Sequence, residues 1–300
     1  MQRIEHSFKA MGGLCRFRLE VAQHFPVQDA LDAAETEVQR LEAKYSRYLE
    51  DSLTSRINNS AGSGDPIPID TETAGLLHYA ETAWRESDGL FDLTSGVLRR
   101  VWDFKSGTPP HPDAVTRLLP RVGWDKVQWS RDSISLPHQE MELDFGGCVK
   151  EYAADSAAMQ LSRCGVTAAL VDLAGDMVAV GVPAGAEGWP IGIRHPGLSG
   201  EAVARVQLPA GALASSGDYE RCITLDGVRY GHILHPRTGW PVRGLVAVSV
   251  LAPQCLVAGS SATIAMLKPV AQGLEWLRCL GLPWIAVDAD LQVHGTLSRD

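Results

Sequence analysis

Residues 222–231 read Cys222-Ile223-Thr224-Leu225-Asp226-Gly227-Val228-Arg229-Tyr230-Gly231. An Asp-Gly pair between two short runs of strand-forming residues is a strong signal for a two-residue β-hairpin, because both residues tolerate the left-handed backbone of that turn. In the rest of the chain, predicted hairpins and helices are mixed and do not follow a strict strand–helix alternation. The sequence therefore predicts an α+β fold and argues against a doubly wound parallel sheet.

The elements on either side of this hairpin follow from hydrophobic periodicity. Apolar residues at steps of three and four predict helices over residues 28–49 and 72–87. We expect further helices over 149–164, which ends at Gly165, over 254–267, which is rich in small residues, and over 274–280. Short apolar or alternating runs predict strands over 168–173, 177–180, 191–194 and 246–251, and a closing hairpin of 284–287 with 291–293. We expect a turn over 214–220. Since no linker divides the chain, we expect residues 1–300 to form one domain with two lobes.

Composition excludes several classes of protein. A chain of 300 residues that is 45% hydrophobic and 21% charged can bury a large core. Its 27 basic and 36 acidic residues give a net charge of −9, which predicts no nucleic-acid partner and no binding to anionic membranes. The first residues lack a signal-peptide pattern and no apolar run reaches the ~18 residues of a membrane span, so we expect a cytoplasmic protein. The six scattered cysteines form no CxxC pair and are expected to be free thiols.

Two clusters of polar residues and glycines suggest chemistry in the first half of the chain. One is Phe91-Asp92-Leu93-Thr94-Ser95-Gly96-Val97-Leu98, and the other is Leu143-Asp144-Phe145-Gly146-Gly147-Cys148-Val149-Lys150. In the second cluster, glycines at a helix start would let a phosphate approach the backbone, and a lysine supplies positive charge. A Gly-Gly turn before a helix with a surface lysine explains these residues equally well.

Two further clusters lie beside the Asp-Gly hairpin. They are Ser216-Gly217-Asp218-Tyr219 before it and Gly231-His232-Ile233-Leu234-His235-Pro236-Arg237-Thr238-Gly239 after it. Histidines with an arginine suit anion binding or general base catalysis, although a single histidine is more often structural. Hydroxyl residues also begin the last long helix, where Ser260, Ser261 and Thr263 fit helix capping and tight packing equally well.

Taken in order, these clusters resemble the ApbE-type flavin transferases. The resemblance begins at Phe8-Lys9-Ala10-Met11-Gly12 and continues through Tyr45-Ser46-Arg47-Tyr48, the four clusters above and Gly175-Asp176. It implies an ApbE-like, T-fold-like arrangement of mixed antiparallel sheets with flanking helices and an FAD cleft between two lobes. It also implies an enzyme that moves FMN from FAD to a Ser or Thr hydroxyl of an acceptor protein that carries a flavinylation motif, with release of AMP.

The resemblance assigns roles to individual residues. His232 matches a general base for the incoming hydroxyl. Contacts to FAD are implied for Met11, Tyr48, Leu90, Phe91, Asp92, Asp144, Lys150 and Ile233. A Mg²⁺ site is implied at the carbonyl of Gly147 and the hydroxyl of Thr263. The acidic ligand of that site is missing, because Gly259 stands where the family has an aspartate, and Mg²⁺ in proteins usually relies on at least one carboxylate.

Two more positions depart from the family pattern. His235 replaces an aspartate in the "H-I-l-D-P" segment, and Glu151 replaces the glycine after the lysine. These departures keep two alternatives open: an inactive FAD-binding relative, and an enzyme of altered metal or flavin chemistry that uses His235 with His232. For a working transferase, the substitution Gly259→Asp is expected to raise the affinity for magnesium.

Overall fold

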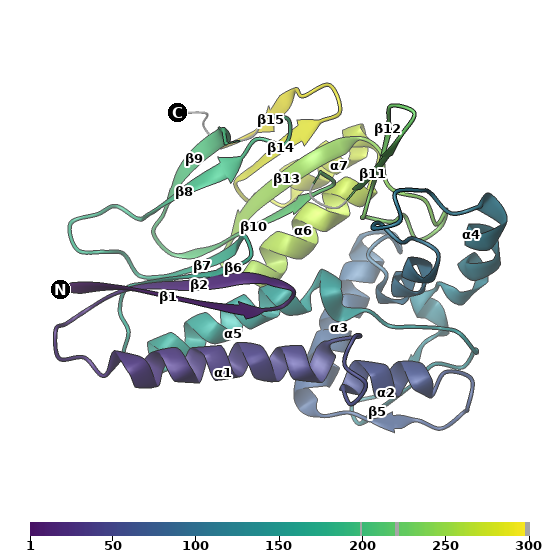
Figure 1. The fold of residues 1–300 in the computed structure, drawn as a ribbon, viewed down its shortest axis with the longest axis horizontal. Helices are drawn as coiled ribbons and strands as arrows, with labels where there is room; N and C mark the ends of the chain where they lie inside the picture. The colour runs from purple at the N-terminus through teal and green to yellow at the C-terminus, as the bar shows by residue number, and fades with distance from the viewer. Residues whose placement is uncertain (199, 220–221, 298–300) are drawn as a thin grey trace.

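The computed structural model describes residues 1–198, 200–219 and 222–297, and its centre is an eight-stranded sheet (Figure 1). The strand order is β1-β2-β6-β7-β10-β13-β14-β15, and neighbouring strands pair antiparallel throughout. The strands are β1 (Gln2–Ala10), β2 (Gly13–Val21), β6 (Ala169–Leu173), β7 (Asp176–Val180), β10 (Gly211–Gly217), β13 (Leu245–Ala252), β14 (Trp284–Asp288) and β15 (Val293–Gly295). This arrangement confirms the predicted α+β class.

Helices cover one face of the sheet. Figure 1 shows α1 and α5 side by side along it, and α6 crosses behind β10 and β13. These helices and their neighbours are α1 (Val27–Tyr45), α3 (Thr71–Glu86), α5 (Val149–Arg163), α6 (Cys255–Leu267) and α7 (Val270–Cys279). The largest core cluster lies between them and the sheet and takes Val171 and Leu173 from β6.

A hairpin covers the opposite face of the sheet. It consists of β8 (Trp189–Arg194) and β9 (Ala202–Leu208), in which buried and exposed residues alternate along β8. Ile191 and Ile193 pack there against Leu170 of β6, so β6 is buried on both faces. This double burial explains why four of the five residues of β6 are apolar, the half-buried Asp172 being the exception.

A third apolar cluster joins the Asp-Gly hairpin to a compact group of short helices. The hairpin strands are β11 (Cys222–Leu225) and β12 (Val228–Gly231), with Asp226 and Gly227 at positive φ in the turn, as predicted. Ile223 packs there with Leu98 and Trp102 from the region of η1 (Leu93–Arg100). The remaining short elements are α2 (Leu53–Asn59), β3 (Ile67–Pro68), α4 (Pro112–Leu118), η2 (Leu119–Arg121), η3 (Trp124–Lys126), β4 (Gln128–Trp129), β5 (Ser133–Ser135) and η4 (Phe145–Gly147).

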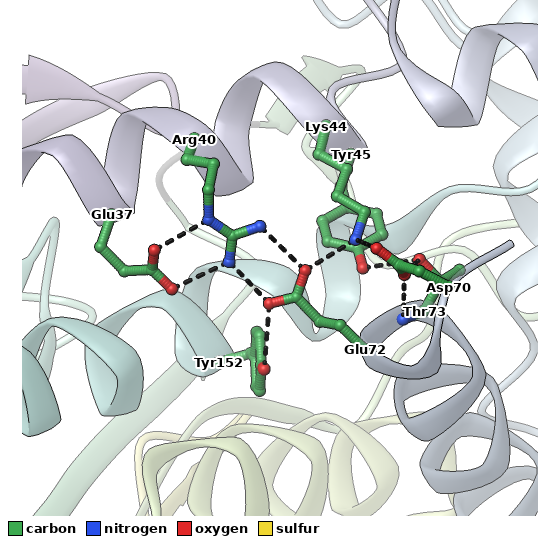
Figure 2. A network of polar contacts seen from close by, with 8 residues as sticks. All are labelled: Glu37, Arg40, Lys44, Tyr45, Asp70, Glu72, Thr73 and Tyr152. Atoms are coloured by element: carbon green, nitrogen blue, oxygen red, sulfur yellow. Dashed lines mark hydrogen bonds and ion pairs between the residues drawn. The ribbon is translucent and has the colours of Figure 1, made fainter.

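A network of ion pairs ties α1 to the start of α3 (Figure 2). Both nitrogens at the end of the Arg40 guanidinium donate to Glu72, at 2.9 and 2.6 Å, and the Lys44 Nζ lies 2.7 Å from the same carboxylate. The hydroxyl of Tyr152 on α5 donates to Glu72 at 3.3 Å. The network therefore connects the three helices α1, α3 and α5.

Several element boundaries differ from the prediction. Residues 214–217 belong to β10 and are not a turn, and residue 220 lies outside the described residues. Helix α1 ends at Tyr45, because Ser46 takes an extended backbone, and not at residue 49. The N-terminal hairpin β1–β2 and strand β9 were not predicted from the sequence. In the described part of the chain, no helix is both long and apolar enough to cross a membrane.

Candidate active site

The segment before α5 brings several of the predicted residues together. Asp144 caps η4, since its Oδ1 accepts a hydrogen bond from the Gly146 nitrogen at 2.8 Å, and the Arg47 Nη1 donates to its Oδ2 at 3.1 Å. Gly147 faces the Phe91 ring, because a Cβ at Gly147 would lie 3.6 Å from the Phe91 Cζ. The loop before α5 therefore packs directly against the polar cluster of residues 91–98.

Lys150 forms a close ion pair with a buried carboxylate. Its Nζ lies 2.6 Å from the Oδ2 of Asp176, a residue that is 2% exposed at the start of β7. Burial works against the charged ammonium, but the carboxylates of Asp176 and Glu151 outweigh it and raise the pKa of Lys150 above its usual value. The lysine is therefore a fixed positive charge, and its side chain keeps 29% of its surface exposed.

Helix α6 is fastened to α5 and to β10. Asp155 of α5 accepts hydrogen bonds from the backbone nitrogens of Cys255 and Leu256, at 2.8 and 3.0 Å, and so caps the start of α6. The Thr263 hydroxyl hydrogen-bonds to the Ser216 hydroxyl of β10 at 2.7 Å. Thr263 thus lies on the face of α6 that meets the sheet.

The end of β12 contacts Asp218, the residue directly after β10. Gly231 packs so closely on Asp218 that a Cβ at Gly231 would lie 2.6 Å from the Asp218 Cβ. His232, directly after Gly231, is half-buried, and Ile233 packs at the edge of the main core. In the turn that follows, the His235 Nδ1 accepts a hydrogen bond from the Arg237 nitrogen at 3.2 Å.

The other predicted FAD contacts lie in different environments. Met11 occupies the β1–β2 turn at φ +53°. Tyr48 is 76% exposed, with the Arg47 guanidinium 5.6 Å from its ring centre. Leu90 is buried. The predicted FAD contacts therefore include both exposed and buried residues.

Asp92 is engaged within the protein. Its Oδ1 accepts hydrogen bonds from the nitrogen and hydroxyl of Thr94, and its Oδ2 accepts one from the Trp124 nitrogen at 2.9 Å. Burial raises the pKa of this carboxyl group despite these bonds. Asp92 therefore holds η1 and η3 together, and its predicted contact with FAD stays a prediction.

Three residues that the structure places in this region were noted in the sequence but received no site role. Arg47 binds Asp144, Asp176 binds Lys150, and the carboxylate of Glu151 lies against Gly259 of α6. Burial and the nearby Asp176 raise the pKa of Glu151. The sequence contained a sign of the role of Glu151, because the chain gains a glutamate at position 151 and lacks the family's aspartate at Gly259.

The residues that could hold a divalent cation are mixed in type. Among residues 1–198, 200–219 and 222–297, no cluster of three or more His, Cys, Asp or Glu side chains could hold a metal ion. Gly147 offers a carbonyl, Thr263 a hydroxyl and Glu151 a buried carboxylate oxygen without a hydrogen-bond partner. This donor set of hard oxygens fits Mg²⁺ when substrate phosphates supply further ligands.

Comparison with known proteins agrees with this geometry. The family model described as "ApbE family" matches residues 11–285. The FAD:protein FMN transferase of Treponema pallidum (strain Nichols) is 32% identical over 288 residues, which cover 89% of this chain and 79% of that protein. The FAD:protein FMN transferase of Vibrio cholerae (strain O395) is 29% identical over 265 residues, 84% of this chain and 78% of that protein.

A solved structure extends the likeness to the fold. The crystal structure of the ApbE protein from Thermotoga maritima superposes with a TM-score of 0.89 at 26% identity, and the match covers 98% of this chain and 97% of that one. The matched residues 11–285 contain every candidate site residue described above. The chain belongs to the ApbE family.

Proposed function

We propose that this protein is an FAD:protein FMN transferase, which moves FMN from FAD to a Ser or Thr hydroxyl of an acceptor protein. The observation that carries the proposal is the pair of Lys150 and Asp176 beside the glycines that open α5. A lysine fixed as a cation, next to backbone that a phosphate can approach, suits the pyrophosphate of FAD. Two relatives with the transferase name cover most of this chain, which supports the same activity.

FAD would lie between the sheet-and-helix body and the group of short helices around η1, in one domain with two lobes. The exposed ring of Tyr48 offers a stacking surface for an aromatic ring system of FAD. Lys150 would neutralise the pyrophosphate, and Asp144, held by Arg47, would orient the loop against the ligand. The remaining contacts in this proposal are Met11, Leu90, Phe91, Asp92 and Ile233.

In the proposed reaction the acceptor hydroxyl oxygen bonds to the phosphorus of the FMN half. The bond from that phosphorus to the bridging oxygen breaks, and AMP leaves with that oxygen. His232 would take the hydroxyl proton. Gly147 and Thr263 would help to hold a divalent cation, which neutralises phosphate charge when bound.

The test is the mass of an acceptor after incubation with FAD, Mg²⁺ and the protein. We expect an acceptor domain with a Thr-containing flavinylation motif to gain the mass of FMN and flavin fluorescence. The variant Lys150→Met should lose most of this activity through weaker FAD binding, whereas Lys150→Arg should keep part of it. An acceptor that stays unmodified, although the wild-type protein binds FAD, would refute the transferase and indicate an FAD-binding protein.

A further inference from the structure

A buried carboxylate without a partner lies between α5 and α6. Glu151 is 7% exposed, and its Oε2 has no hydrogen-bond partner. Burying a polar atom with no partner costs free energy, and such an atom in a native protein calls for an explanation such as a missing ion. Glu151 is thus a buried group of this region with one carboxylate oxygen left unbonded.

The carboxylate occupies space that a side chain at position 259 would otherwise fill. A Cβ built on Gly259 would lie 2.6 Å from the Glu151 Cγ and 2.7 Å from its Oε1. Asp155, one turn further along α5, contacts the start of α6, so the two helices run in opposite directions and Glu151 lies beside Gly259. Thr263 follows Gly259 by one turn on the same face of α6.

The charged groups around Glu151 do not neutralise its carboxylate fully. The Lys150 Nζ forms an ion pair with the Asp176 Oδ2 at 2.6 Å, and no hydrogen bond or ion pair joins this ammonium group to Glu151. Burial and the negative charges of Asp176 and Asp155 raise the pKa of Glu151, and the nearby ammonium of Lys150 offsets part of this effect. A divalent cation at the free oxygen would therefore relieve repulsion as well as satisfy the orphaned atom.

We propose that Glu151 supplies, from α5, the carboxylate ligand of a divalent-cation site that also includes the Thr263 hydroxyl and the Gly147 carbonyl. On this proposal the acidic ligand comes from α5 and not from α6, and the Glu151 side chain fills the space that a Cβ at position 259 would take. Mg²⁺ is commonly held by one or two carboxylates together with substrate phosphates. This inference rests on the proposed function for the FAD phosphates that would complete the coordination.

An ordinary structural role does not explain these observations. Glutamate at the third residue of a helix is favoured by the helix dipole. A solvent-exposed glutamate makes this interaction equally well. The interaction therefore requires neither burial of the side chain against a glycine of another helix nor an unbonded oxygen. The neighbouring Gly259, which gives the carboxylate its space, is therefore part of the same feature.

The contact between Gly259 and Glu151 also changes what we expect of the variant Gly259→Asp, for which the sequence predicted a higher affinity for magnesium. Gly259→Asp alone does not rebuild a metal site, because its Cβ would overlap the Glu151 side chain. We expect this single variant to lose stability through overpacking, as small-to-large changes in packed interiors do. The informative variant is the exchange Glu151→Ala with Gly259→Asp, which frees the space and returns a carboxylate to α6.

The first experiment measures Mn²⁺ binding by the full chain in the presence of FAD, from the electron paramagnetic resonance signal of the free ion. Wild type should bind one Mn²⁺, and Glu151→Gln should weaken the affinity more than about tenfold, because it removes the ligand charge and keeps the shape. Asp290→Asn, at an exposed position in the turn before β15, is the control for loss of one negative charge and should leave the affinity unchanged. Wild-type affinity in Glu151→Gln would overturn the proposal.

The second experiment is the double exchange. Glu151→Ala should lose Mn²⁺ binding, and Glu151→Ala with Gly259→Asp should recover at least about a tenth of the wild-type affinity, with circular dichroism confirming the fold. A folded double variant that binds Mn²⁺ no better than Glu151→Ala would contradict the claim that the two positions supply the same ligand.

These outcomes are separable from the proposed function. Mn²⁺ binding that depends on Glu151, without any transfer of FMN, would refute the transferase and leave the cation site in place. Transfer of FMN whose magnesium dependence is the same in Glu151→Gln and wild type would refute the cation site and leave the transferase in place.

Discussion

Asp92 shows how a carboxylate in a family motif can be used inside the fold. It accepts three hydrogen bonds, two from Thr94 and one from the Trp124 nitrogen. Its replacement in Asp92→Ala leaves buried donors unpaired, so we expect the free energy of unfolding to fall by about 2–3 kcal/mol in urea denaturation. The exposed neighbour Asp125→Ala should change it by less than about 0.5 kcal/mol. Unchanged stability in Asp92→Ala together with lost FAD affinity would assign Asp92 to the ligand instead.

His235 tests the alternative of an altered metal chemistry. Its Nδ1 accepts a hydrogen bond from the Arg237 nitrogen, and a carboxylate can accept the same bond in an Asx-type turn. Burial and the Arg237 charge lower the pKa of His235, so it is neutral at pH 7. We expect His235→Asp to keep the magnesium-dependent initial rate of FMN transfer within about threefold of wild type. A rate that disappears in this variant would support a catalytic or metal-binding imidazole.

At the scale of single residues, the sequence pointed to segments of the candidate site and not to the contacts between them. The segments around Asp144, Gly147 and Phe91 could be predicted, because glycines and a lysine before a helix have a local meaning. The partners of these residues could not. Asp176 reaches Lys150 from another element, and Glu151 reaches Gly259 across two helices. Such pairs depend on tertiary packing, which local sequence patterns do not contain.

Among the elements, the junction of α1 and α3 has a predictable response to pH. The Arg40 hydrogen bonds are the largest effect on Glu72, and with Lys44 they outweigh burial and lower its pKa from 4.5 to about 2 (Figure 2). Because the folded pKa lies below the unfolded one, the network stabilises the protein fully above about pH 4.5 and loses this effect as the pH falls towards 2.

The variant Glu72→Gln isolates this contribution. At pH 7 we expect its free energy of unfolding to be about 1–2 kcal/mol below that of wild type, since hydrogen bonds between charged groups are lost. Urea denaturation at pH 7, 5, 4 and 3 should show the gap between the two proteins closing below pH 5. A gap of constant size across this range would contradict the ionised network.

Strand β10 explains why some elements escaped prediction. Its residues, Gly211-Ala212-Leu213-Ala214-Ser215-Ser216-Gly217, are small and partly polar, a composition typical of turns. In the fold it pairs with both β7 and β13, and the Ser215 and Ser216 hydroxyls bond to Ser249 and Thr263, each at 2.7 Å. By contrast, α3, α5 and α6 were predicted within one or two residues, because their amphipathic or apolar patterns are local.

Over the whole molecule, the candidate site joins distant parts of one chain. Contacts join Arg47 to Asp144, Lys150 to Asp176 and Thr263 to Ser216, in each case between segments far apart in the sequence or in different elements. These segments belong to the central antiparallel sheet, to the helices that cover it and to the loops between them (Figure 1). The α+β class followed from the mixture of hairpins and helices. The order of the eight strands did not, because pairs such as β2 with β6 join residues far apart in sequence.

The most direct test of the transferase is the ratio of two products in one reaction. The purified protein is incubated with FAD, Mg²⁺ and the acceptor domain, and AMP in solution is quantified against FMN bound to the acceptor. Transfer as proposed predicts one AMP for each FMN on the acceptor, and little AMP when the acceptor threonine is replaced by alanine. AMP accompanied by free FMN, with the acceptor unmodified, would contradict it and show hydrolysis of FAD instead.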